Sequence, residues 1–341
     1  MAQPADYSTY TLGDFTLKQG GTIPNATLAY KTIGDTSKPA IIYPTWYSGT
    51  IATNLWLIGP DKTLNPSNYY IIIPALFGNG ESSSPSNRPD LKPFPNVTFY
   101  DNVRAQYELV TKYLGIKHVR AVLGWSMGAA QTYQWATQYP EFMDLVAPFC
   151  GSAKTSLHNQ VFLEGVKSAL LGAKGEASAG VCEAARVREW TVGERETGLK
   201  ALGRVYAGWG FSQAFYRERV FESVLGFGSL EEFMKGFWEA WALSKGPLAV
   251  TLFARPVGNA LTDAWYPPDP ENMLTMLYTW QSGDVSQQEP YNGDFAKAMQ
   301  GIKAKALVMP SRTDLYFRAF RSFSLRDYLT NNQDSARRLR D

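Results

Sequence analysis

A serine enclosed by glycines, at the junction of a predicted strand and a predicted helix, constrains the fold of this chain most. The run Gly124-Trp125-Ser126-Met127-Gly128 directly follows the apolar run 119–123 and opens a helical pattern over 129–140. A strand-to-helix turn this tight strains its central residue, and the flanking residues must be small because the backbones approach closely. The pattern therefore predicts that Ser126 is a nucleophile whose hydroxyl projects at the top of a sheet.

Short apolar runs predict the other strands of that sheet. They lack strict alternation of apolar and polar residues, which is typical of strands that are covered on both faces. The runs cover residues 40–43, 69–73, 119–123 and 145–149, and another follows at 305–309.

A helical pattern over residues 101–115 lies between two of these runs. Asp101 is the predicted N-cap and Gly115 the residue that ends the helix, while Val103 and Val110 share one helical face. Strand, helix and strand at this spacing form a βαβ unit, which predicts a doubly wound, mostly parallel sheet. Together with the serine turn, this sheet predicts the α/β-hydrolase fold.

The middle of the chain predicts a helical lid inserted into that fold. In the segment 229–243, Ser229 and Glu232 have the spacing of a capping box. Leu230, Phe233, Phe237 and Trp241 fall on one face, which is either core packing or the lining of an apolar pocket. The predicted divisions are a first core part (1–155), a lid (156–292), a second core part (293–317) and an arginine-rich tail (318–341).

The charge balance excludes a nucleic-acid partner, because 33 Lys+Arg face 31 Asp+Glu in 341 residues and no basic excess is left to bind a polyanion. The N-terminus lacks a signal-peptide pattern, and no apolar run approaches the roughly 18 to 20 residues of a membrane span. We therefore expect a cytoplasmic protein with no membrane contact, in which Cys150 and Cys182 stay reduced.

A nucleophilic serine also needs donors for the oxyanion, a general base and a carboxylate that orients the base. In this fold one donor is the amide after the nucleophile, here Met127, and another comes from the loop after an early strand. That loop is 43–49, and its Trp46 amide is the predicted second donor. Asp314 follows the run 305–309 and is the predicted acid; Asp263, Asp269 and Asp284 lie in the insertion and are poorer candidates.

Three longer motifs carry a family resemblance over residues 15–317. They read LIGPDKTLNPSNYYIIIPALFGNGESSSPSN, DNVRAQYELVTKYLGIKHVRAVLGWSMGAAQTYQWATQYP and ALVMPSRTDLYF. The chain resembles the homoserine O-acetyltransferase-like branch of the α/β-hydrolases, especially its fungal members. Arg104 of the VRAQ motif is expected to be structural.

This resemblance implies acyl transfer through an acyl-serine between a small-molecule donor and acceptor. Acetyl-CoA or another acyl-CoA is the implied donor, with no metal or redox cofactor, and a homodimer is possible. The implied roles are nucleophile for Ser126, triad acid for Asp314, and oxyanion hole for the Trp46 and Met127 amides.

Two local departures weaken homoserine as the acceptor. The acetyltransferases have Gly before the nucleophile and a Gly pair after it, whereas here Trp125 precedes Ser126 and Ala129 follows Gly128. The loop 43–49 also differs from the family's form. A generic esterase and an acyltransferase therefore both stay open.

The catalytic base is the other departure. Family members continue to a Gly-His segment, but after Phe317 this chain has six Arg, three Asp and no His. The last strand and helix are therefore expected to be missing, as in a C-terminal truncation. His118 is expected at the surface, and His158 is the alternative base on the carboxyl side of the sheet. Against the enzyme stands a second hypothesis, an impaired paralogue or ligand-binding pseudoenzyme.

Overall fold

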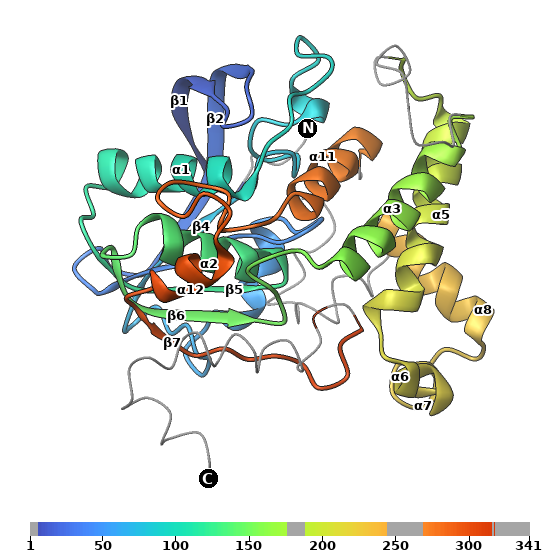
Figure 1. Cartoon of the computed structure of the whole chain (residues 1–341). Coiled ribbons are helices and arrows are strands. Elements are labelled where there is room, and N and C mark those ends of the chain that lie inside the picture. The colour runs from blue at the N-terminus through green and yellow to red at the C-terminus, as the bar shows by residue number, and fades with distance from the viewer. Residues whose placement is uncertain (1–5, 176–187, 244–268, 316, 318–341) are drawn as a thin grey trace.

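The computed structural model describes residues 6–175, 188–243, 269–315 and 317, and a seven-stranded sheet lies at its centre (Figure 1). The described strands follow the order β1-β2-β4-β3-β5-β6-β7, in which β1, β2 and β4 pair antiparallel and all later pairs are parallel. This confirms the predicted α/β-hydrolase fold with a mostly parallel sheet. The strands are β1 (Ser8–Thr16), β2 (Thr22–Ile33), β3 (Ala40–Ile42), β4 (Tyr70–Pro74), β5 (Val119–Trp125), β6 (Met143–Phe149) and β7 (Lys305–Ala306).

The central strands are buried on both faces, as their continuous apolar runs predicted. Successive side chains of a strand point to opposite faces, so Ile41 and Ile42 join different clusters. Ile42 packs in a cluster with residues of α1 (Phe99–Glu108) and α2 (Met127–Gln138). Ile41 and Ile71 belong to a cluster that continues into the helices between β6 and β7.

Helix α1 begins earlier than predicted, because Thr98 and not Asp101 is its N-cap. The Asp101 carboxylate accepts from the Thr98 N–H at 3.0 Å, and the Thr98 hydroxyl accepts from the Asp101 N–H at 3.3 Å. The same carboxylate accepts from the Lys18 N–H at 2.8 Å. After α1 the helix continues as the π-helical turn η3 (Leu109–Tyr113), and Gly115 has the left-handed φ of 70° expected after a helix end.

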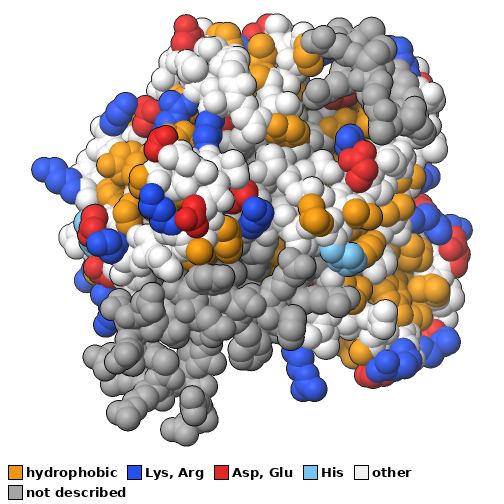
Figure 2. Space-filling model, viewed as in Figure 1, with side chains coloured by type: hydrophobic (Ala, Val, Ile, Leu, Met, Phe, Trp, Pro, Cys, Tyr) orange, Lys and Arg blue, Asp and Glu red, His pale blue; other side chains and the backbone are white. Residues whose placement is uncertain are grey.

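A cap of helices follows β6 in the chain and forms a lobe beside the sheet (Figure 1). Figure 2 shows apolar side chains gathering over this lobe, on the right of the view, while charges of both signs are mixed elsewhere on that face. The described cap helices are α3 (Leu157–Gly172), α5 (Val192–Gly210), α6 (Gln213–Arg217), α7 (Val220–Ser223), α8 (Leu230–Phe233), η4 (Met234–Glu239), α9 (Ala240–Ala242) and α11 (Pro270–Gln281).

The predicted capping box at α8 is half formed. The Ser229 hydroxyl accepts from the Glu232 N–H at 3.1 Å, but the Glu232 carboxylate accepts from the Gly228 N–H at 2.8 Å. Of the predicted apolar face, Phe233 and Phe237 are buried, whereas Leu230 is half exposed. The prediction that Leu230 belongs to the buried face was therefore wrong. Leu230 lies on the first turn of α8, which is in contact with solvent.

The chain returns to the sheet through α12 (Phe295–Gln300) and β7. Strand β7 is shorter than the predicted run 305–309, yet Leu307 and Met309 still donate backbone hydrogen bonds to β6, at 2.9 and 3.1 Å. The described residues do not include Cys182, Asp263 or the tail 318–341. The expected loss of a last strand and helix therefore stays a prediction. Because β5, β6 and β7 pair in parallel, their carboxyl ends lie together at one edge of the sheet.

Candidate active site

Ser126 occupies the strained turn between β5 and α2 that its glycines predicted. Its φ and ψ are 56° and −119°, and a residue with a side chain rarely adopts such a positive φ. A methyl group on Gly124 would lie 2.2 Å from the Gly128 backbone, and one on Gly151 would lie 2.6 Å from the Ser126 carbonyl oxygen. Glycine is required at these positions because backbone packs against backbone around the serine.

The two predicted oxyanion donors lie on segments that pack against each other. Gly128, in the first turn of α2, approaches the loop so closely that an added methyl group would lie 3.0 Å from the Pro44 carbonyl oxygen. The Thr45 N–H is occupied, since it donates to the Pro74 carbonyl at 3.1 Å. Within the described part of the chain, no acceptor is recorded for the N–H groups of Trp46 or Met127, as an oxyanion hole requires.

Asp314 lies at the same edge of the sheet, beyond β7. Its carboxylate accepts from the Phe317 N–H at 2.8 Å. It also lies near Cys150, the residue after β6: burial raises the pKa of the Cys150 thiol and the Asp314 charge raises it further. Phe149, the last residue of β6, accepts from the Ser126 N–H at 3.1 Å. The predicted nucleophile and acid therefore follow β5 and β7, the strands on either side of β6.

Neither of the chain's two histidines is hydrogen-bonded to Ser126 in the described ranges. His118 is half exposed at the start of β5, 2.9 Å from the Asp144 carboxylate, at the opposite end of the strand from the serine. His158 is exposed on the first turn of α3, with its ring 4.9 Å from that of Trp209. A role for His158 as the base stays a prediction.

Arg104 makes contacts of the structural kind that we expected. Its guanidinium lies 3.9 Å from the centre of the Phe15 ring and donates to the Thr16 carbonyl. It also lies 3.9 Å from Asp101.

Aromatic rings surround the backbone on either side of the serine. Trp125 makes edge contacts with Trp46 and Trp56, with ring centres 4.9 and 6.3 Å apart. Tyr47 stacks on Tyr206 of the cap helix α5 at 5.8 Å. These rings tie the loop 43–49 to both the serine turn and the cap.

The sequence patterns did not indicate the buried carboxyl of Glu81, which is linked to that loop through the side chain of Asn79. The carboxyl accepts from the Ile51 N–H at 2.9 Å and from the Asn79 side-chain amide at 2.9 Å. The same Asn79 amide donates to the Gly49 carbonyl at 3.2 Å. Burial raises the pKa of Glu81 to about 7, although these hydrogen bonds oppose the rise. No local pattern in the sequence marks Glu81 as buried, because its neighbours are Gly and Ser.

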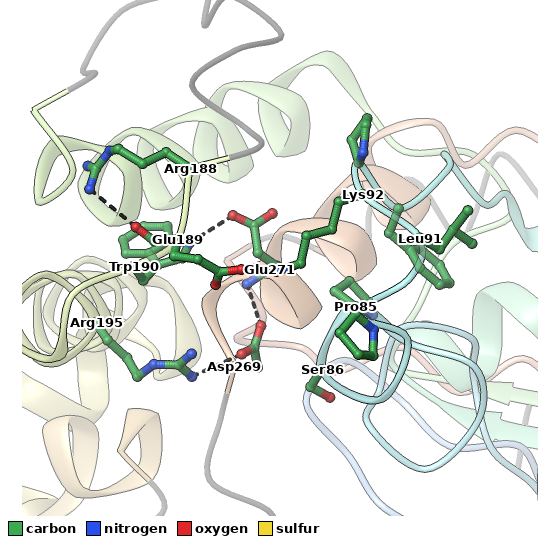
Figure 3. A pocket seen from close by; sticks show the side chains of 13 residues that line it. Pro85, Ser86, Leu91, Lys92, Arg188, Glu189, Trp190, Arg195, Asp269 and Glu271 are labelled. Atoms are coloured by element: carbon green, nitrogen blue, oxygen red, sulfur yellow. Dashed lines mark hydrogen bonds and ion pairs between the residues drawn. The ribbon is translucent and has the colours of Figure 1, made fainter.

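A cavity of about 320 Å³ lies elsewhere, between the segment 85–94 and the first turns of α5 and α11 (Figure 3). Its charged side chains form two ion pairs: Lys92 of the core pairs with Glu189, just before the cap helix α5, and Arg195 pairs within the cap with Asp269 at 2.9 Å. Ser126, Asp314 and the two predicted oxyanion donors do not line this cavity. Asp269, one of the poorer acid candidates, is the N-cap of α11 and the ion-pair partner of Arg195.

The described ranges hold no group of three or more His, Cys, Asp or Glu placed to bind a metal ion. None of the described helices has the length and apolar character that crossing a membrane requires.

The comparisons with known proteins agree with the observed fold. The family described as alpha/beta hydrolase fold matches residues 51–166. A probable esterase of Corynebacterium glutamicum is 34% identical over 321 residues, which are 91% of this chain and 82% of that protein. Ethyl acetate hydrolase of Pseudomonas veronii is 35% identical over 319 residues, 91% of this chain and 81% of that protein.

A solved structure of the acetyl esterase MekB superposes with a TM-score of 0.82 at 34% identity, over 96% of this chain and 87% of that one. Homoserine O-acetyltransferase of Natronomonas pharaonis is 30% identical, but over only 44% of this chain. The matches thus favour esterases over the narrower fungal acetyltransferase type that the motifs suggested. The chain belongs to the α/β-hydrolase superfamily, to which its similarity to a probable esterase and to ethyl acetate hydrolase over 91% of its length assigns it.

Proposed function

We propose that this protein is a serine esterase that hydrolyses short-chain acyl esters through an acyl-Ser126 intermediate. The observation that carries the proposal is the strained Ser126 turn between β5 and α2, with unused amides beside it. The Ser126 oxygen attacks the ester carbonyl while its proton passes to a base, for which His158 is the candidate. The alcohol leaves with that proton, and water then releases the acid. The Trp46 and Met127 amides hold the oxyanion, and Asp314 orients the base.

The aromatic rings near the serine support a short acyl group. Trp125 stands directly before the nucleophile and packs against Trp46 and Trp56, so rigid rings fill space that a long acyl chain would need. The names of the relatives, an ethyl acetate hydrolase and an acetyl esterase, agree with an acetyl group. Water is the proposed acceptor, and acyl-CoA with an alcohol acceptor is the alternative pair of substrates.

The test compares the full chain with Ser126→Ala on p-nitrophenyl acetate, butyrate and octanoate. We expect acetate to be hydrolysed fastest, and Ser126→Ala to lower kcat by at least about a thousandfold, because the nucleophile is lost. A fluorophosphonate should add to the wild-type protein alone, as intact mass measures. Faster use of acetyl-CoA with homoserine than of p-nitrophenyl acetate would instead identify an acyltransferase.

A second candidate is a ligand-binding protein without turnover. It is favoured by the observation that neither His118 nor His158 is hydrogen-bonded to Ser126 in the described part of the chain. Saturable binding of an ester without formation of product, with the same affinity in wild type and Ser126→Ala, would identify a ligand-binding protein.

A further inference from the structure

A buried glutamine on helix α2 joins the two backbone segments that carry the proposed oxyanion donors. The side-chain amide nitrogen of Gln131 lies 2.8 Å from the Thr45 carbonyl oxygen and 3.3 Å from the Met127 carbonyl oxygen. The first carbonyl belongs to the peptide group that contains the Trp46 N–H. One side-chain amide therefore sets the spacing between the loop 43–49 and the first turn of α2.

The Thr45 carbonyl controls the direction of the Trp46 N–H. In a planar trans peptide group the C=O and the N–H point in opposite directions, so holding one fixes the other. The other polar groups of Thr45 are already held, because its N–H donates to Pro74 and its hydroxyl accepts from the Leu76 N–H, both at 3.1 Å. Rotation of the Thr45–Trp46 peptide is the remaining freedom, and Gln131 removes it.

Two further buried side chains determine which end of the Gln131 amide faces the loop. The indole N–H of Trp135 can only donate, and it lies 2.8 Å from the Gln106 side-chain oxygen. The Gln106 nitrogen must then face Gln131, where it donates to the side-chain oxygen at 2.6 Å. This leaves the Gln131 nitrogen for Thr45. All three side chains are fully buried, so water does not compete for these bonds.

We propose that Gln131 is a positioning residue for acyl transfer, which aims the Trp46 N–H at the oxyanion, and that Gln106 and Trp135 orient it. The inference rests on the proposed function of Ser126 and names residues that act through the backbone without touching the substrate. Such a residue affects the transition state more than the bound ester, since the oxyanion forms only during the reaction.

The main test is Gln131→Met, which keeps the side-chain volume and removes the donor. Its matched control is Gln134→Met on the same helix, since Gln134 is also buried but donates to Gln138 at 3.0 Å and to Gln288 at 2.9 Å, away from the loop. We expect Gln131→Met to lower kcat for p-nitrophenyl acetate about tenfold or more with KM within threefold. Gln134→Met should keep both constants within threefold of wild type.

A second variant acts at a distance from the loop. In the ionised form of Gln106→Glu, which an assay at alkaline pH favours, one carboxylate oxygen would accept from Trp135 and the other from the Gln131 nitrogen. This would turn the Gln131 oxygen toward the Thr45 carbonyl. We expect kcat to fall as in Gln131→Met, although the side-chain hydrogen bonds of Gln106 in the described structure go to Gln131 and Trp135 and not to the loop. A role in packing alone would leave kcat within threefold in this variant.

Hydrogen exchange of residues 43–51, measured by mass spectrometry, gives a readout that does not need turnover. We expect faster exchange in Gln131→Met and Gln106→Glu than in wild type or Gln134→Met. A folded Gln131→Met with wild-type kcat and exchange, or a Gln134→Met with equal losses, would overturn the inference. If the wild-type protein hydrolyses no ester above Ser126→Ala, the proposed function fails, and the exchange rates still decide the role of Gln131.

Discussion

At the scale of single residues, Glu81 shows how burial changes the pKa of a side chain that no sequence pattern distinguishes. Its pKa is raised by its buried surroundings and lowered by hydrogen bonds from the Ile51 N–H and the Asn79 amide, and no charged side chain of the described ranges contributes. Its pKa rises from 4.5 to about 7 on folding, so the folded protein binds this proton more tightly than the unfolded chain. The stability that protonation supplies is present below about pH 4.5 and is lost as the pH rises through about 7.

We therefore expect Glu81→Gln to remove this contribution to the pH dependence of stability. Between pH 5 and pH 8, the free energy of unfolding should fall by up to about 3 kcal/mol more in wild type than in the variant. Urea denaturation at both pH values measures the difference. Glu141→Gln is the control, because the Glu141 side chain is 82% exposed. Parallel pH profiles for wild type and Glu81→Gln would contradict this account.

At the scale of elements, Asp101 connects the start of α1 to the turn between β1 and β2. The buried carboxylate accepts from the N–H groups of Thr98 and Lys18, which lie on separate elements. Asp101→Ala leaves the buried Thr98 N–H and the part-buried Lys18 N–H without this acceptor, so we expect a loss of about 3 kcal/mol in the free energy of unfolding.

The matched control is Glu108→Ala on the same helix. Glu108 lies 2.8 Å from Lys112, which is exposed, in an i,i+4 pair, so its loss should cost about 0.5 kcal/mol or less. Chemical denaturation compares the two variants. Equal losses would show that α1 depends on its charge pattern and not on the buried capping box.

At the scale of the whole molecule, core and cap share one apolar cluster. It contains Ile71 of the sheet, Tyr47 of the loop, Tyr206 of α5 and Trp280 of α11. Because the cap helices bury their rings against the core and not only against one another, we expect core and cap to unfold in one transition. Tryptophan fluorescence, far-UV circular dichroism and calorimetry should give one midpoint. Two separated midpoints would show that the cap is an independent unit.

Much of this molecule could be predicted because its signals are local. Apolar runs identified the central strands, and the glycines around Ser126 identified the turn, since short-range backbone sterics impose both. The start of α1 was missed because Thr98 and Asp101 exchange hydrogen bonds that spacing alone assigns ambiguously. Leu230 was misplaced because helical periodicity defines a face without saying which turn of it is covered.

The sequence by itself determined the fold class, the strained turn at Ser126 and the edge of the sheet where the chemistry is proposed, because neighbours in the chain encode strands, turns and their order. Only the tertiary structure decided which side chains support that edge. Gln131 meets the Thr45 carbonyl across 86 positions, and Glu81 meets Ile51 across 30. Such contacts depend on how the loop, the helix and the sheet pack together, and burial at those junctions gives an ordinary Gln or Glu its role.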